Sequence, residues 1–231
     1  MQSYYAARAS EYDRVYLKPE RQPDLRQIEQ WLPSVLAGAT VLEVACGTGY
    51  WTRFIAPVAS AVVALDSSPE TLRIAKERVA APHTEFHVGD AYALPRFGRS
   101  FSAAFAGFWF SHVPLERQRE FLLGLNAALA PGARVVLLDN LFVAGSSTPI
   151  VERDANDNTY QSRSLNDGSI HRVLKNFPTE AQLHALAAAG LGESSAYRRW
   201  QYYWAFEYLV PDPSSASVPA SPALHSPPSD P

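Results

Sequence analysis

Two glycines and a nearby acid form the part of the sequence best suited to hold a ligand. Gly47 and Gly49 follow a short apolar run, residues 41–45, that predicts a buried parallel strand, and a helix-like segment comes next. A strand, a glycine turn and a helix in this order let bare backbone approach a nucleotide-like ligand. Glu43 lies inside the strand, where an acid is costly unless something pairs with it. We therefore expect Glu43 to serve a ligand, and a cationic one, because its charge would repel a phosphate.

A second acid, Asp66, ends the next apolar run, residues 61–66. An acid at this place, roughly 20 residues past the glycines, can accept hydrogen bonds from both hydroxyls of a ribose. A dinucleotide-binding dehydrogenase would carry a third glycine where Thr52 stands. The difference argues against an NAD-dependent oxidoreductase, which is one alternative to the interpretation that follows.

Three segments resemble the motifs of the class I S-adenosylmethionine (SAM) dependent methyltransferases, in that family's order and spacing. Residues 43–49, Glu-Val-Ala-Cys-Gly-Thr-Gly, resemble its first motif, residues 65–72 its second and Gly89-Asp90-Ala91 its third. The resemblance implies an α/β, Rossmann-like fold: a seven-stranded, mostly parallel sheet with helices on both faces and a terminal antiparallel hairpin. It implies SAM as cofactor and S-adenosylhomocysteine (SAH) as product. The cofactor-binding residues that it implies are Glu43, Ala45, Cys46, Gly47, Gly49, Asp66, Ser67, Asp90, Ala91 and Phe108.

The alternation of apolar runs and helical stripes independently predicts a parallel sheet wound on both faces. We expect strands at 41–46, 61–66, 84–88, 101–106 and 133–139, and helices at 24–37, 50–58, 69–81, 115–129 and 178–190. Ser68 is the expected cap of the helix over 69–81, and Pro131-Gly132 is expected to end the helix over 115–129. Residues 140–177 are expected to be a long irregular insertion, whereas 194–210 alternate as a hairpin does. Because ligands lie outside the carboxyl ends of the strands in such sheets, the motif residues should meet in one crevice.

The chain divides into three expected parts: an opening lid or cap over 1–27, the SAM-binding domain over 28–210 and a Pro/Ser-rich tail over 211–231. The tail has 7 prolines and 6 serines in 21 residues, and we expect it to be disordered. Within the opening, residues 3–18 are expected to close over the crevice and exclude water. Tyr12 and Tyr16 should point inward, because a four-residue spacing places both on one helical face.

Composition agrees with a single enzyme domain and excludes several other classes. The net charge of −3 and the lack of a basic run argue against a nucleic-acid partner. One cysteine, Cys46, allows no internal disulfide, and the acidic run 154–158 lacks the glycine and the final acid of a calcium loop, so no metal is expected. No apolar stretch approaches 18 residues and the start lacks a signal-peptide core, so we expect a cytoplasmic protein without a membrane partner, either monomer or homodimer.

Methyl transfer from a sulfonium mostly requires that the acceptor be held in line with the methyl group, with a base only where the acceptor starts protonated. His112, just past the fourth strand, is the candidate catalytic base, although it could instead contact the helix that begins near Pro114. The candidate acceptor-binding residues are Tyr12, Tyr16, Trp51 and Trp109, whose aromatic faces suit a flat heterocycle or a cation.

The acceptor is expected to be a small molecule. The tetrapeptide Asp/Asn-Pro-Pro-Tyr, frequent in family members that methylate nucleic-acid bases and protein amides, is replaced by residues 107–110, Gly-Phe-Trp-Phe. The opening segment resembles azapteridine N-methyltransferases of the toxoflavin type, from bacterial secondary metabolism. We therefore expect a flat heteroaromatic acceptor methylated at nitrogen. An O-methyltransferase of a small metabolite and a SAM-binding module without turnover are the alternatives.

Overall fold

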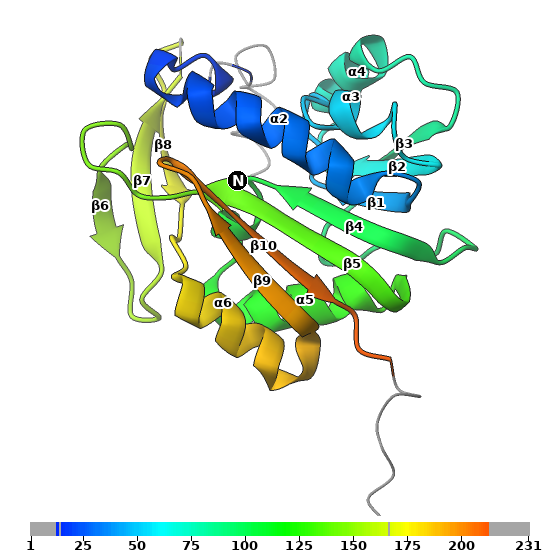
Figure 1. Cartoon of the computed structure of the whole chain (residues 1–231). Helices are drawn as coiled ribbons and strands as arrows, with labels where there is room; N and C mark the ends of the chain where they lie inside the picture. The colour runs from blue at the N-terminus through cyan, green and yellow to red at the C-terminus, as the bar shows by residue number, and fades with distance from the viewer. Residues whose placement is uncertain (1–12, 14, 166, 213–231) are drawn as a thin grey trace, which may run out of the picture.

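A computed structural model describes residue 13 and residues 15–165 and 167–212. Within these residues the main sheet has seven strands in the order β3-β2-β1-β4-β5-β10-β9 (Figure 1). Its strands are β1 (Thr40–Val44), β2 (Ala61–Asp66), β3 (Thr84–Val88), β4 (Phe101–Gly107), β5 (Leu129–Asn140), β9 (Glu193–Arg199) and β10 (Tyr203–Leu209). Strands β1 to β5 are parallel, and β10 runs antiparallel to both β5 and β9. The predicted mostly parallel sheet with a terminal antiparallel hairpin is confirmed.

Helices cover both faces of this sheet. Figure 1 shows α2, α3 and α4 on one side and α5 and α6 on the other. Their bounds are α2 (Gln22–Leu36), α3 (Thr52–Ile55), α4 (Pro69–Arg78), α5 (Gln118–Asn126) and α6 (Glu180–Leu186), with short helical turns η2 (Pro19–Arg21), η3 (Phe110–His112), η4 (Leu115–Arg117) and η5 (Ala187–Leu191). The Ser68 hydroxyl caps α4 as predicted, accepting a hydrogen bond from the Thr71 N–H at 3.2 Å.

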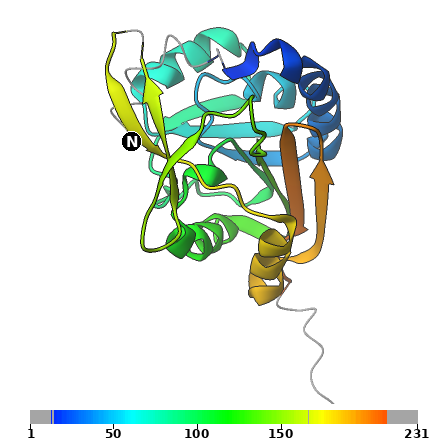
Figure 2. The same cartoon turned by 90° about the vertical axis from the view of Figure 1, so that its left-hand side faces the viewer.

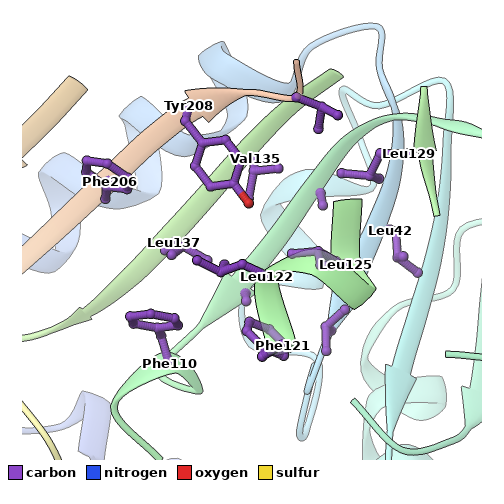
Figure 3. Packing of buried hydrophobic residues seen from close by; sticks show 14 of the residues in the cluster. Leu42, Phe110, Phe121, Leu122, Leu125, Leu129, Val135, Leu137, Phe206 and Tyr208 are labelled. Carbon is purple, nitrogen blue, oxygen red and sulfur yellow. The ribbon is translucent and has the colours of Figure 1, made fainter. Parts of the chain in front are cut away.

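Two apolar cores follow from the alternation of side chains along the strands. Leu42 and Val44 of β1 pack with Phe121, Leu122 and Leu125 of α5, the core drawn in Figure 3. The intervening Val41 packs on the opposite face with Ile28 and Leu32 of α2. Glu43 has the same strand parity as Val41, so it belongs to the face covered by α2 and α3.

The expectation that residues 140–177 are irregular was wrong. They contain a second, three-stranded antiparallel sheet in the order β6-β7-β8, made by β6 (Ile150–Arg153), β7 (Thr159–Ser164) and β8 (Ile170–Leu174). Figures 1 and 2 show it beside the carboxyl end of β5. The buried side chains of β7 are Thr159 and Gln161, which are polar, so no apolar alternation marks the strand.

The boundary between α5 and β5 also differs from the prediction. The helix ends at Asn126 and the strand begins at Leu129, so Pro131 and Gly132 lie inside β5 and do not end a helix. The pairing of β4 with β5 shifts register there, and Gly132 takes φ +73°, a conformation that favours glycine. The helices predicted at 50–58 and 69–81 are shorter as well, because α3 spans 52–55 and α4 ends at Arg78.

Candidate active site

The carboxyl ends of β1 and β4 mark the crevice through strained backbone. Ala45 follows β1 with φ 56° and Phe108 follows β4 with φ 57°, and neither residue is a glycine. A left-handed conformation is uncommon for such residues and clusters at ligand-binding sites. Since β1 and β4 are hydrogen-bonded neighbours, the two turns lie side by side. The position agrees with the crevice predicted outside the strand ends.

The glycine turn takes the shape that its sequence predicts. Gly47 has φ 55° and Gly49 has φ 73°. A Cβ built on Gly49 would lie 3.1 Å from the Cβ and 3.2 Å from the Cα of Ala75 in α4. Gly49 is thus required both for its backbone conformation and for the close approach of α4.

Asp66 is bound to the turn rather than left open to solvent. Its Oδ2 accepts a hydrogen bond from the Gly47 N–H at 2.8 Å. Its Oδ1 accepts from the Ser68 N–H at 2.9 Å and from the Thr71 hydroxyl at 3.2 Å. Burial raises the pKa of the Asp66 carboxyl. The three hydrogen bonds just named, and a further one from the Ser67 backbone, oppose this rise. Asp66 therefore links the ends of β1 and β2 and keeps lone pairs for a ligand.

Glu43 is a deeply buried acid of the crevice, and one of its oxygens has no hydrogen-bond partner. Its side chain is 1% exposed, and Oε2 has no hydrogen-bond partner. Burial raises the pKa of the Glu43 carboxyl to about 8; a hydrogen bond from the Thr52 hydroxyl opposes the rise, and the negative charge of Asp66 adds to it. A neutral polar atom of the following segment, Trp51 Nε1, is also buried without a hydrogen-bond partner. Such groups are rare in folded proteins and indicate a missing ligand or water.

Cys46, Asp90 and Ala91 take up the remaining predicted cofactor positions. The Cys46 thiol is buried, and burial raises its pKa well above the ordinary value, which disfavours the reactive thiolate. Asp90 is exposed, and its Oδ1 accepts a hydrogen bond from the Tyr92 N–H at 2.9 Å, while Ala91 is buried. The Tyr92 ring lies under the Arg117 guanidinium at 3.8 Å, a contact that sequence reasoning missed.

The predicted aromatic residues separate into two groups. Tyr16 stacks on Tyr50 with 3.5 Å between ring centroids and also contacts Trp51 and Phe108, at 6.0 and 5.7 Å. Trp109 instead packs on Tyr92 and Phe121, on the α5 face of the sheet. The structure therefore brings Tyr16, Trp51 and Phe108 together but does not join Trp109 to them. Tyr12 lies outside the described residues.

His112 is buried where the small sheet meets η3. Its Nδ1 lies 2.6 Å from the carbonyl oxygen of Leu174, so Nδ1 carries the proton and the neutral ring has its basic lone pair on Nε2. Burial lowers the pKa of the His112 imidazole well below its ordinary value, and the positive charges of Lys175 and Arg163 lower it further. His112 is therefore neutral at pH 7, as a base or a hydrogen-bond acceptor must be.

A buried ion pair lies next to His112. Lys175 Nζ is 2.8 Å from Asp139 Oδ1 at the end of β5, and the other oxygen of Asp139 accepts a hydrogen bond from the Ser111 N–H at 3.0 Å. Burial lowers the pKa of the Lys175 ammonium; Asp139 opposes this, and the positive charges of Arg163 and Arg21 reinforce it. These four charged residues were not predicted as a site, because Lys175 and Arg163 belong to the segment expected to be irregular.

The two arginines of this group are held by neutral hydrogen-bond partners. The Arg21 guanidinium is 5% exposed and donates to Asn140 Oδ1 at 2.9 Å and Ser146 Oγ at 3.0 Å. Arg163 donates through Nη2 to Gln161 Oε1 at 2.7 Å. Among the described residues, neither guanidinium pairs with a carboxylate. We call Arg21, Arg163 and Lys175 the cationic cluster; Asp139 pairs with Lys175 and the Glu20 carboxylate interacts with Arg21, so the group as a whole carries a net charge of +1.

Comparison with known proteins identifies the family. A family model described as a methyltransferase domain matches residues 41–132. The solved structure of DhpI in complex with SAH is 30% identical in sequence to this chain. The match covers 92% of this chain and 95% of DhpI, and the two structures superpose with a TM-score of 0.75. The chain belongs to the SAM-dependent methyltransferases. A second DhpI structure, bound to SAM and HEP, gives 31% identity and a TM-score of 0.72, with 89% of this chain and 94% of that one covered.

Curated relatives agree with this assignment over part of their length. The demethylmenaquinone methyltransferase of Shouchella clausii (strain KSM-K16) is 31% identical over 128 residues, which are 53% of this chain and 52% of the relative. The chain thus spans about half the length of the curated relatives that it matches. SAM is the cofactor of this methyltransferase, and the backbone turns and the unpaired acid of the crevice fit it. Across the described residues we find no helix long and apolar enough to cross a membrane and no group of three or more metal-ligating side chains.

Proposed function

We propose that this methyltransferase transfers the methyl group of SAM to an oxygen of a small acceptor's anionic group. The observation that supports the proposal is the cationic cluster, in which two arginines that form no ion pair with a carboxylate act electrostatically on a buried lysine. Buried charges are strongly disfavoured unless they are paired, so an anion that completes the cluster would be bound firmly. A guanidinium also presents paired donors that match the oxygens of a carboxylate, phosphate or phosphonate.

The place of the cluster suits the chemistry. Asp139 and Ser111 hold Lys175; Asp139 lies at the end of β5 and Ser111 in η3, just after β4, so both lie at the same strand ends as Phe108 and the glycine turn. SAM, when bound, supplies an electrophilic methyl group and a neutral sulfide as the leaving group. An anionic oxygen attacks that carbon without losing a proton, and the C–S bond breaks as the C–O bond forms. The protein therefore has to orient the acceptor and exclude water, not to remove a proton.

His112 has a distinct role in this arrangement. Its neutral imidazole is fixed through Nδ1 by the Leu174 carbonyl, where the charges of Lys175 and Asp139 act on it. We propose that the imidazole, held in this way, helps to position the acceptor's anionic group next to Lys175. Where the acceptor atom is itself a hydroxyl or an N–H group, His112 would be the general base that the sequence suggests.

The cofactor-binding residues remain those proposed from the sequence. Gly47, Gly49 and Ala45 would present backbone to SAM, Cys46 would keep the turn compact, and Asp66 with Ser67 would bind the ribose. Asp90, Ala91 and Phe108 would surround the adenine end, and Glu43 would face the ammonium group of the methionine portion. The orphaned Glu43 oxygen and the left-handed turns support these roles.

A flat heteroaromatic acceptor methylated at nitrogen is the second candidate. The aromatic group of Tyr16, Trp51 and Phe108 favours it, because such faces stack on flat rings. These rings also contact one another closely, however, and the cationic cluster gives no reason for a neutral ring to bind. We therefore place the anionic oxygen first. A monomer or homodimer acting on a small molecule, with a lid over residues 1–27, also remains part of the proposal.

An acceptor panel separates these candidates. Purified enzyme and SAM are offered matched sets of small phosphonates and carboxylates, heteroaromatic amines and neutral alcohols, and SAH formation is measured. We expect turnover with an anionic set, and a KM for that acceptor at least about tenfold higher in Arg163→Gln. Arg153→Gln is the control, because Arg153 is an exposed arginine of β6 in the same small sheet. Turnover confined to heteroaromatic amines would refute the anionic acceptor, and SAM binding without turnover on any set would favour a non-catalytic module.

A further inference from the structure

In the turn between β1 and α3, the glycines and the other residues make different contacts. Gly47 and Gly49 leave backbone bare, whereas the side chains of Thr48 and Tyr50 both contact the opening segment of the chain. Thr48 is 2% exposed, so these are buried contacts. The turn is therefore attached to Asp13 and Tyr16 through the positions that are not glycine.

Three side chains form a closed link at this place. The Thr48 hydroxyl donates to Asp13 Oδ1 at 2.7 Å and accepts from Arg78 Nη1 at 3.0 Å. The same Nη1 donates to the Thr48 carbonyl oxygen at 2.9 Å. Arg78 Nη2 pairs with Asp13 Oδ2. Both oxygens of Asp13 and both terminal nitrogens of Arg78 take part in this link, and such networks are stronger than their separate pairs.

A second contact lies three residues further along. Tyr16 is 5% exposed and stacks on Tyr50 with an interplanar angle of 8°. The carbonyl oxygen of Tyr16 accepts a hydrogen bond from Gln22 Nε2 at 2.7 Å, which joins it to the start of α2. Asp13 and Tyr16 thus bind the turn at Thr48 and Tyr50, on either side of Gly49.

We propose that Asp13 is a positioning residue for the cofactor turn, and that the Asp13–Thr48–Arg78 link must open before cofactor or product can exchange. This inference rests on the proposed role of residues 47–49 in holding SAM. Asp13 does not touch the reacting atoms; it acts by fixing Thr48, and with it the backbone on both sides. Because the side chains of Asp13 and Arg78 are 35% and 22% exposed, salt weakens their attraction, and opening should quicken as ionic strength rises.

The test measures SAH dissociation by stopped-flow displacement in the full-length enzyme. In Asp13→Asn and in Thr48→Val we expect dissociation about tenfold faster than in the wild type, the change that loss of one charge-assisted hydrogen bond produces. The wild-type rate should rise between low and high salt, and the Asp13→Asn rate should rise less. The reversed pair Asp13→Arg with Arg78→Asp should recover part of the slow rate, which a merely structural role would not do.

Arg73→Gln is the matched control, because Arg73 lies on α4 like Arg78 but pairs only with Glu77 at the surface. It should leave dissociation unchanged. Equal dissociation rates in wild type, Asp13→Asn and Thr48→Val would overturn the proposal. Asp66→Ala separates this outcome from failure of the site itself: if that variant binds SAM normally, the cofactor assignment fails, whereas if it binds weakly while Asp13→Asn behaves as wild type, only the link is wrong.

Discussion

Glu43 gives the sharpest test of how the crevice receives its cofactor. Its carboxyl is buried without a partner for Oε2, and its pKa is raised from 4.5 to about 8. At pH 7 about nine-tenths of the molecules therefore carry a neutral Glu43 before SAM binds. An ammonium group placed beside Glu43 stabilises the carboxylate and lowers this pKa again. SAM binding should then expel the proton.

Calorimetry measures that proton directly. SAM is titrated at pH 7 in buffers of different ionisation enthalpy, and the slope of binding enthalpy against ionisation enthalpy gives the protons released. We expect about 0.9 proton in the wild type and about none in Glu43→Gln. At pH 7 the ligand amine contributes little, because a free α-amino group titrates near 7.7–8.0. Glu85→Gln, which removes an exposed acid from β3, is the control.

The Glu43→Gln variant also tests how much the Glu43 carboxyl lowers the free energy of unfolding. A folded-state pKa above the unfolded value means that the native protein binds more protons, so Glu43 costs stability increasingly as pH rises from 4.5 to 8. At pH 7 the difference is 2.5 pH units, or about 3 kcal/mol at 1.36 kcal/mol per unit. Glu43→Gln should therefore be more stable than the wild type by up to about 3 kcal/mol in urea unfolding, yet bind SAM at least about tenfold more weakly. Equal proton release from both proteins, or a less stable variant, would refute the reasoning.

Three further predictions concern single positions. Asp66→Ala should weaken SAM binding at least about tenfold in calorimetry, since it removes charge-assisted hydrogen bonds worth roughly 1.5–3 kcal/mol; unchanged affinity would remove Asp66 from the site. Gly49→Ala should lower the free energy of unfolding by about 1–2 kcal/mol, because the backbone has φ +73° and the added Cβ would lie 3.1 Å from the Cβ of Ala75. The same substitution should abolish SAM binding. Gly124→Ala in α5, where nothing lies within 4 Å, should instead raise stability by about 1 kcal/mol, so equal losses at both glycines would contradict this account. Burial holds the pKa of His112 below 6.5, so the unfolded chain binds more protons and the free energy of unfolding should fall as pH drops below 6.5. His112→Asn should reduce that fall, measured by urea unfolding at about pH 5.5 and 7.5. An unchanged dependence on pH would argue against a buried neutral imidazole.

Local chemistry allowed much of the domain to be predicted from the sequence. The strand over 61–66 and the cap at Ser68 were predicted correctly, because apolar runs and capping side chains act over a few residues. The turns around Gly47 and Gly49 have the left-handed backbone expected of them. These signals do not depend on distant parts of the chain.

The cationic cluster was missed because its signals are not local. The strand β7 buries Thr159 and Gln161, so its inner face is polar and no alternation of apolar residues betrays it. With that strand unrecognised, Arg163 and Lys175 had no predicted position near Asp139. The left-handed turn at Phe108 directs its ring and that of Trp109 into different cores, which their adjacency in sequence did not indicate, and a role of Trp109 in acceptor binding stays a prediction.

The position of β10 has a consequence for how the molecule assembles during synthesis. Residues 203–209 pair with β5 on one side and β9 on the other, so a late segment of the chain occupies an interior place in the sheet. Trp204 and Tyr208 are buried there, and until they arrive β5 exposes an unpaired edge. The edge of β5 therefore stays open to incorrect pairing until β10 has left the ribosome. Because pairing between segments so far apart in the sequence is slow, this exposure is prolonged. Substitutions that weaken β10 should lower yield through aggregation before they affect the rate of methyl transfer by molecules that have folded.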